Sequence, residues 1–190
     1  MAVYTEVTDA ALEAFLTDYD VGTVTAFKGI AGGVENTNYL LDTTEGRYIL
    51  TLYEKRVAEA DLPFFVGLMD HLAASGFPCP RPIRRRDGAA LGRLEGRAAA
   101  MVSFLDGVDV KRPTPEQCYM AGAAMARMHA NGTDFSIKRT NALAPHGWPE
   151  LADASRARAD EVEPGLAALI DSELDALASL WPSELPSGVI

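Results

Sequence analysis

The spacing of apolar residues changes along the chain from a helical repeat to a strand repeat. Residues 9–18 carry apolar residues at helical spacing, and Thr8 stands where an N-cap is needed. Residues 22–30, GTVTAFKGI, mix β-branched and aromatic residues with polar ones, which is typical of a strand. Residues 39–43 and 48–53 predict two further strands joined by a turn. We therefore expect an initial helix followed by an antiparallel meander.

A second helix is expected over residues 61–75, where apolar positions return to helical spacing. Asp61 is expected to cap its start, and Gly76 supplies a stop. The apolar face of this helix is predicted to consist of Leu62, Phe65, Leu68, Met69 and Leu72. The helix therefore interrupts the strands and is followed by the proline-punctuated connection FPCPRPI.

Two glycine-containing dipeptides predict a second group of strands. Asp87-Gly88 and Glu95-Gly96 are typical of tight turns. An apolar strand is expected after the second turn, from Ala98 to Leu105. About five antiparallel strands are thus predicted, with one helix inserted after the third.

The remainder of the chain is predicted to be helical. Residues 114–117 (TPEQ) combine an N-cap threonine, a proline at the first helical position and a capping-box glutamine. A loop is expected around residues 131–132 and 148–149, and an amphipathic helix over residues 164–180. Side chains that we expect to pack rather than bind a ligand are Met120, Met125, Met128, Trp148 and Trp181.

This order of elements indicates an α+β fold of the protein-kinase N-lobe type. A five-stranded antiparallel sheet with one inserted helix, followed by helices, differs from both the singly alternating α/β pattern and the plain β-sandwich. We expect residues 1–105 to form an N-lobe that covers a nucleotide. Residues 106–190 are expected to form the first helices of an incomplete, mostly helical C-lobe.

The net charge of −10 argues against nucleic acid as a partner, since nucleic-acid binders usually present a basic field. A local cluster of arginines admits two interpretations, a pocket for nucleotide phosphates or a solvated strand edge; its members are Arg81, Arg84, Arg85 and Arg86. No apolar run approaches the ~18 residues of a membrane span, and the N-terminus does not resemble a signal peptide. Together with two cysteines lacking metal-ligand spacing, these features predict a cytoplasmic protein without a membrane partner.

The stretch GGVENTNYLL, residues 32–41, is the main candidate for ligand binding. Gly32 and Gly33 permit close approach of the backbone to a ligand, and the polar side chains of residues 36–38 could donate hydrogen bonds to phosphate oxygens. Glycine and asparagine also dominate ordinary hairpin turns. The residues alone therefore leave a phosphate-covering loop and a plain turn open.

Longer segments resemble the aminoglycoside phosphotransferase-like kinases, which have a protein-kinase-like fold. The similar segments are GGVENTNYLLDTTEGRYILTLYEKR, LMDHLAASGFPCPRPI, AAAMVSFLDG and AGAAMARMHANGTDF. They extend along nearly the whole chain, and the ENTNYLL…YILTLYEKR block is the most specific. Within the family, these segments look most like those of bacterial homoserine kinases.

The resemblance implies ATP-dependent transfer of the γ-phosphoryl group to the hydroxyl of L-homoserine, a step of threonine biosynthesis, with Mg²⁺ bridging the phosphates. It assigns adenine contacts to residues 103–105 and phosphate contacts to the opening stretch. The implied ATP-binding residues are Gly32, Gly33, Val34, Glu35, Asn36, Thr37, Asn38, Thr51, Ser103, Phe104 and Leu105. Alternatives are a kinase for an aminoglycoside, a choline-like alcohol or a sugar amine, or a non-catalytic nucleotide-binding module.

Two departures from the family pattern stand out. The third-strand position of the usual lysine holds Thr51, with Lys55 and Arg56 just beyond it, and no partner glutamate is evident. The catalytic pattern H-x-D-x-x-x-x-N does not occur at any histidine of the chain. We therefore expect no catalytic residue or metal ligand in this chain, and expect it to be the N-terminal part of an enzyme whose catalytic residues lie beyond Ile190.

Overall fold

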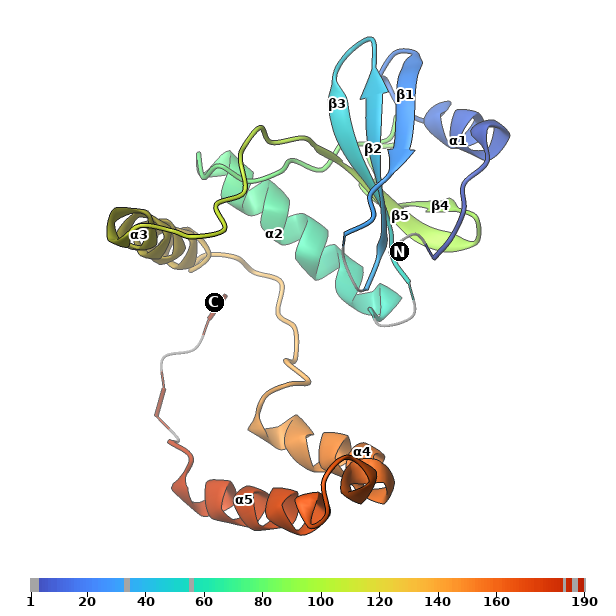
Figure 1. The fold of residues 1–190 in the computed structure, drawn as a ribbon. Helices are drawn as coiled ribbons and strands as arrows, with labels where there is room; N and C mark the ends of the chain where they lie inside the picture. The colour runs from blue at the N-terminus through green and yellow to red at the C-terminus, as the bar shows by residue number, and fades with distance from the viewer. Residues whose placement is uncertain (1–3, 33–34, 55–56, 183, 186–187, 190) are drawn as a thin grey trace. The chain divides into compact units, whose positions relative to one another are not determined.

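The computed structural model describes residues 4–32, 35–54, 57–182, 184–185 and 188–189. The chain divides into two compact units, residues 1–137 with 188–190 and residues 138–187 (Figure 1). The expected lobe boundary after residue 105 falls where the chain has left the sheet, inside the first unit, and stays a prediction.

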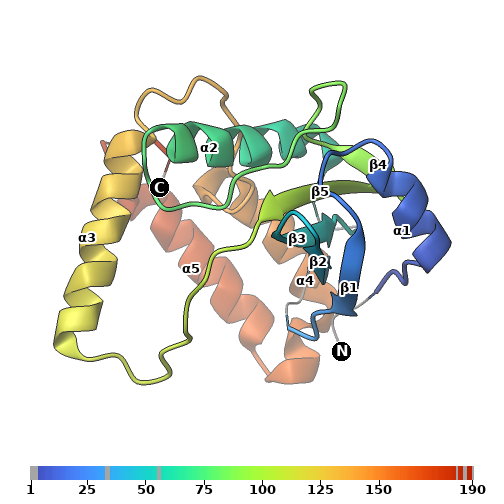
Figure 2. The ribbon, with the colours of Figure 1, turned by 90° about the horizontal axis from the view of Figure 1, so that it is seen from above.

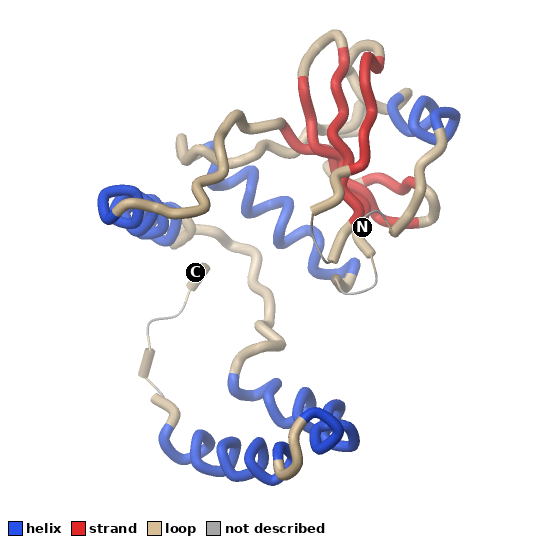
Figure 3. The backbone as a smooth tube through the Cα atoms, in the orientation of Figure 1, coloured by secondary structure: helices blue, strands red, loops and turns tan. Residues whose placement is uncertain are grey.

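A five-stranded antiparallel sheet dominates the first unit, as the sequence predicted (Figures 1 and 3). Its spatial order is β1-β2-β3-β5-β4, so the first three strands form the expected meander. The strands are β1 (Val24–Gly29), β2 (Thr37–Thr43), β3 (Arg47–Leu52), β4 (Gly92–Leu94) and β5 (Arg97–Ser103).

The second group of strands is shorter than expected. The Asp87-Gly88 turn forms, with the Arg85 N–H donating to the Ala89 carbonyl at 2.9 Å, but its arms are not strands. Strand β4 has 3 residues, and Glu95 and Gly96 join it to β5 with positive φ angles of 50° and 73°. Positive φ at both turn residues matches the right-handed twist of a hairpin.

Helix α1 (Asp9–Leu16) helps to cover one face of the sheet, which we call the α1 face (Figure 2). Thr8 caps the helix as predicted, because its hydroxyl accepts from the Ala11 N–H at 3.2 Å. Alternate residues of the strands meet the helix in one core, where Leu41, Leu50, Leu52, Ala99 and Met101 have no exposed surface.

Helix α2 (Leu62–Ala74) packs on the opposite face, which we call the α2 face. Val66 is buried there against Ala100 of β5. The predicted cap at Asp61 is wrong, since its side chain makes no capping hydrogen bond. A 3-10 turn, η1 (Glu59–Asp61), leads into the helix. The backbone of Asp61 is therefore helical (φ −87°, ψ −16°), whereas an N-cap residue has an extended backbone.

Three arginines of the predicted basic cluster are bound to carboxylates. Nη2 of Arg85 lies 2.6 Å from Oδ2 of Asp18, and Nη2 of Arg86 lies 2.8 Å from Oδ1 of Asp20. Arg84 forms an ion pair with Asp70. These pairs tie α2 and the segment after α1 to the connection before β4. These three ion pairs, together with the hydrogen bond from Nη2 of Arg81 to the Ala73 carbonyl at 3.2 Å, favour a structural role over a pocket for nucleotide phosphates.

Helix α3 (Pro115–Asn131) begins with the predicted capping box between Thr114 and Gln117. No residue of this helix is buried, and Met120 and Met125 are 62% and 56% exposed. The predicted packing of the methionine stripe is therefore not found in the described part of the chain.

The second unit contains η2 (Pro145–Gly147), α4 (Trp148–Val162) and α5 (Leu166–Leu180). Trp148 begins a helix instead of lying in the expected loop, because Pro149 fits the first turn. Its ring packs edge-on against that of Trp181, with 4.9 Å between the two ring centroids. Both tryptophans therefore pack as predicted. None of the described helices has the length and apolarity needed to cross a membrane.

Candidate functional site

The pairing register places two rows of side chains on the α2 face. Asn38 lies opposite Thr51, and Thr51 opposite Ala100, so these three residues form one row across β2, β3 and β5. The next row, two residues along each strand, consists of Leu40, Ile49 and Val102. Because Ala100 packs against α2 and side chains alternate along a strand, both rows point to the α2 face.

The first row is polar where it crosses β2 and β3. The Thr51 hydroxyl donates to Oδ1 of Asn38 at 2.8 Å, which joins two predicted nucleotide contacts. The Asn38 amide nitrogen has no hydrogen-bond partner among the described residues, so two N–H donors stay available. At the strand position of the usual kinase lysine, the site therefore offers neutral hydrogen-bonding groups.

Lys28 is the cation that the sequence interpretation overlooked. It pairs with Leu40 in the β1–β2 register and so extends the second row onto β1. Its side chain is exposed and has no acidic partner among the described residues. The sequence signal was a lysine inside a strand next to the glycine-rich stretch. Lys55 and Arg56 lie outside the described residues.

The second row is an aliphatic surface that ends at the segment predicted to contact adenine. Leu40, Ile49 and Val102 are all half-buried. Three adjacent aliphatic side chains of this kind form a surface on which an aromatic base can lie, because base and surface are both removed from water.

At the end of β5 and just after it, some main-chain N–H groups are hydrogen-bonded within the protein and others are free. The Ser103 N–H donates to the Arg81 carbonyl at 2.8 Å, and the Phe104 N–H donates to the Arg47 carbonyl at 3.1 Å. The N–H of Leu105, which is 49% exposed, makes no hydrogen bond to the described residues, and neither does its carbonyl. Of the three predicted adenine residues, Leu105 therefore provides the free donor.

Phe104 is held by the side chain of Arg47. The guanidinium carbon lies 5.3 Å from the Phe104 ring centroid, and the same group contacts Asp42 at 2.6 Å. The hydrogen bond to Asp42 raises the pKa of Arg47, so the cation stays charged. Together with the hydrogen bond from the Phe104 N–H to the Arg47 carbonyl, this contact joins the segment after β5 to the first residue of β3.

The predicted phosphate stretch is only partly described. Gly32 is exposed, and a Cβ atom at this position would meet no atom within 4 Å. Gly33 and Val34 lie outside the described residues, and Glu35 is exposed. The Ile30 N–H donates to the Asn38 carbonyl at 2.8 Å, which closes the connection between β1 and β2.

Thr37 and Asn38 are neighbours in sequence but lie on opposite faces. Thr37 has no exposed surface. Its hydroxyl donates to Oε1 of Glu54 at 2.8 Å and accepts from the N–H groups of Tyr4 and Thr5 at 2.9 and 3.1 Å. A hydroxyl has one hydrogen and two lone pairs, so all its capacity is used. The Thr37 side chain is therefore unavailable to a phosphate, contrary to our expectation from the sequence.

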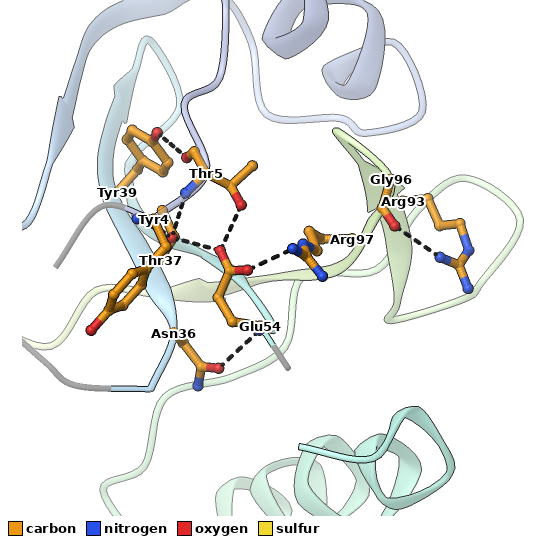
Figure 4. A network of polar contacts seen from close by, with 9 residues as sticks. All are labelled: Tyr4, Thr5, Asn36, Thr37, Tyr39, Glu54, Arg93, Gly96 and Arg97. Carbon is orange, nitrogen blue, oxygen red and sulfur yellow. Dashed lines mark hydrogen bonds and ion pairs between the residues drawn. The ribbon is translucent and has the colours of Figure 1, made fainter. Parts of the chain in front are cut away.

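Glu54 is the centre of this polar network and was not predicted (Figure 4). Its carboxylate accepts hydrogen bonds from Thr5 and Thr37 and contacts Arg97, while its N–H donates to Oδ1 of Asn36 at 3.4 Å. The only signal in the sequence was an acid directly after a buried strand.

Metal ligands are not gathered in the described part of the chain. The described residues contain no group of three or more His, Cys, Asp or Glu side chains able to hold a metal ion. We therefore assign no ligand of Mg²⁺ to them, and Mg²⁺ stays a prediction for the whole enzyme.

Comparison with known proteins places this geometry in context. The model of a family described as "Phosphotransferase enzyme family" matches residues 26–190. Curated homoserine kinases from Methylobacterium sp. (strain 4-46), Xanthobacter autotrophicus and Rhizobium etli are 60%, 56% and 56% identical to the chain over 190 residues. The match covers 100% of this chain, which spans 59% of the length of each relative.

Solved structures show the same architecture. A spectinomycin phosphotransferase in complex with ADP and spectinomycin superposes with a TM-score of 0.67, covering 96% of this chain and 60% of that one at 15% identity. An aminoglycoside phosphotransferase from Alicyclobacillus acidocaldarius superposes with a TM-score of 0.54, covering 94% and 52% at 16% identity. This likeness bears on the fold, and it confirms the predicted kinase-like α+β class.

Proposed function

The chain belongs to the phosphotransferase enzyme family, and on that premise we propose that it forms the nucleotide-binding part of an ATP-dependent homoserine kinase. The observation that carries the proposal is the identity of 56–60% with homoserine kinases along all 190 residues. Such similarity covers both the strands that form the α2 face and the segment that follows β5. The geometry of the α2 face then suggests how a nucleotide would bind.

Adenine would lie against the aliphatic row formed by Leu40, Ile49 and Val102. One edge of the base would meet the main chain at Leu105, whose N–H and carbonyl are free. Ser103 and Phe104 would position this segment rather than donate to the base, because their N–H groups are engaged. The structure of ADP bound to spectinomycin phosphotransferase, a protein with the same fold, supports this kind of ligand.

The phosphates would lie beyond the polar row, near the described ends of the β1–β2 connection. Asn38 would donate through its free amide, while Thr51 holds that amide in place. Lys28 and the main-chain N–H groups around Gly32 would supply further positive potential. Phosphoryl transfer depends chiefly on positioning and on stabilising negative charge, so preorganised donors of this kind are what the reaction needs.

The test uses the whole enzyme that contains this chain. Purified enzyme is incubated with ATP and Mg²⁺ and with a panel of acceptors: L-homoserine, L-serine, spectinomycin, kanamycin and choline. We expect ADP release to depend on L-homoserine, with O-phosphohomoserine as the product identified by mass spectrometry. Faster turnover of another acceptor would replace homoserine as the substrate, while leaving the nucleotide assignment in place.

A non-catalytic nucleotide-binding module is the second candidate, and Thr51 at the usual lysine position favours it. The two candidates differ in one measurement on the whole protein. A non-catalytic module would bind ATP in a calorimetric titration but would transfer no phosphoryl group to any acceptor. Residues 1–190 alone are expected to show no transfer in either case, because none of their histidines belongs to the H-x-D-x-x-x-x-N pattern.

A further inference from the structure

We propose that Glu54 is a positioning residue for the nucleotide site, and that it does so by tying the N-terminal segment, residues 4–7, to the entry of β2. The entry of β2 means residues 36–38, which lead from the glycine-rich stretch into the strand. This proposal rests on the proposed nucleotide site on the α2 face. It assigns a role to residues that lie outside that site.

The carboxylate of Glu54 is surrounded by donors (Figure 4). Oε1 accepts from the hydroxyls of Thr5 at 2.7 Å and Thr37 at 2.8 Å, and Oε2 lies 3.1 Å from Nε of Arg97. The Glu54 side chain is only 10% exposed, and that of Arg97 is 35% exposed. A carboxylate removed from water in this way needs its partners, since an unpaired buried charge is strongly destabilising.

The N-terminal segment is attached to the same cluster by its backbone. The N–H groups of Tyr4 and Thr5 donate to the Thr37 hydroxyl. Tyr39, two residues further along β2, donates its hydroxyl to the Thr5 carbonyl at 2.8 Å and accepts from the Val7 N–H at 3.2 Å. Burial raises the pKa of Tyr39, so its hydroxyl keeps its proton at neutral pH.

Both the side chain and the main chain of Glu54 form hydrogen bonds with the entry of β2. Its carboxylate holds Thr37, and its main-chain N–H donates to the side chain of Asn36. Asn38, the next residue, presents the free amide on the opposite face of the same strand. Rotation or fraying at residues 36–37 would move the Asn38 amide directly, since the residues are consecutive in one strand.

The sequence position of Glu54 gives the network a second connection to the site. Glu54 lies two residues after the end of β3, which carries Thr51. The residue thus links the end of β3 to the start of β2 at one edge of the polar row formed by Asn38 and Thr51. Removing the link should loosen both partners of that row, which predicts weaker binding of ATP rather than a lower rate of the chemical step.

The experiment compares Glu54→Gln and Glu54→Ala in the whole enzyme with Glu59→Gln as a matched control. Glu59 pairs with Arg93 at 2.6 Å, so both glutamates have a partner on the β4–β5 hairpin. The Glu59 side chain is 57% exposed and makes no hydrogen bond or ion pair with the described residues at the entry of β2. The control therefore removes a glutamate–arginine pair to the same hairpin, more exposed than that of Glu54, without touching the network.

We expect Glu54→Ala to raise the KM for ATP about tenfold, which corresponds to about 1.4 kcal/mol, with kcat changed less. Glu54→Gln keeps an acceptor for Thr5 and Thr37 and should give an intermediate KM. Glu59→Gln should leave KM unchanged. A KM equal to that of the wild type in folded Glu54→Ala, or an equal rise in Glu59→Gln, would overturn the proposal.

Hydrogen exchange separates this proposal from the proposed function and from simple unfolding. In Glu54→Ala without nucleotide, the amides of Tyr4, Thr5 and residues 36–38 should exchange faster, while those of β5 keep their protection. Thr37→Val should reproduce the effect and Thr37→Ser should restore protection. Uniform loss of protection across the sheet would mean a structural role only. Selective loss in a protein that phosphorylates no homoserine would retain the positioning role and reject the substrate.

Discussion

The two faces of the sheet are built from the same strands but have different uses. On the α1 face, Thr37 and Leu50 have no exposed surface, and every hydrogen-bonding position of the threonine hydroxyl is occupied. On the α2 face, Asn38 and Ile49 are half-buried, and the asparagine amide keeps free donors. Complete burial uses up hydrogen-bonding capacity in folding, whereas partial burial leaves capacity for a ligand.

The largest expected contrast comes from truncating one aliphatic side chain on each face. Leu50→Ala should lower the free energy of unfolding by about 2–5 kcal/mol, because a cavity opens in a fully buried core. Ile49→Ala, at the adjacent half-buried position, should cost less stability and raise the KM for ATP several-fold, since it removes part of the proposed adenine surface. Urea unfolding and steady-state kinetics of the whole enzyme measure the two effects. Equal stability losses and unchanged kinetics would erase the distinction between the faces.

A second contrast uses the two polar neighbours of β2. Thr37→Val leaves the N–H groups of Tyr4 and Thr5 and the Glu54 carboxylate short of a partner, so we expect a loss of about 1–3 kcal/mol in stability. Asn38→Ala should lower stability by less than about 1 kcal/mol, because only the Thr51 hydroxyl loses its acceptor, and should weaken ATP binding several-fold. Urea unfolding and calorimetric titration with MgATP measure the two effects. A larger loss of stability in Asn38→Ala than in Thr37→Val would reverse the assignment.

A smaller effect is expected for the exposed cation on the α2 face. Lys28→Ala should leave stability within about 0.5 kcal/mol of the wild type, as for most surface substitutions. It should raise the KM for ATP about two- to threefold at low salt and less at high salt, because the interaction is screened. Lys111→Ala, which removes an exposed lysine outside the sheet, is the control. A rise in KM that is independent of salt would exclude a direct electrostatic role.

The last contrast is a pH dependence on the α1 face, which is confined to alkaline solution. Burial raises the pKa of Tyr19 to about 12, and its hydroxyl has no hydrogen-bond partner among the described residues. Between pH 10 and 12 the unfolded chain releases this proton while the folded chain retains it, so stability should fall as pH rises. Tyr19→Phe should reduce that fall and cost little at neutral pH. An unchanged slope of unfolding free energy against pH in this variant would contradict the assignment.

Secondary structure was predictable where local chemistry decides it. The meander, the inserted helix and the capping box at Thr114 all follow from spacing and from short-range hydrogen bonds. The cap at Asp61 was mispredicted because tertiary packing placed a 3-10 turn before the helix. The methionine stripe of α3 was assigned to a core from helical spacing, which cannot say whether a partner surface is present.

The candidate site was predicted less completely than the fold. Residues 36–38 appeared as one polar run, and only the structure shows that β2 begins at Thr37, so that Thr37 is buried on one face and Asn38 is half-buried on the other. Glu54 and Lys28 were missed because their contacts come from segments distant in sequence: Glu54 meets Thr5 across 49 positions, and Lys28 lies opposite Leu40. Spacing along a strand does not encode such neighbours.

The amino-acid sequence alone determined the order of elements, the antiparallel sheet with its inserted helix, and the family, because these depend on local periodicity and on long similar segments. Tertiary structure alone decided which face each polar side chain occupies, which arginines are neutralised by carboxylates, and which main-chain groups stay free. The physical reason is that burial and hydrogen-bond saturation are set by partners from other strands and helices. Those partners come together only when the sheet has formed.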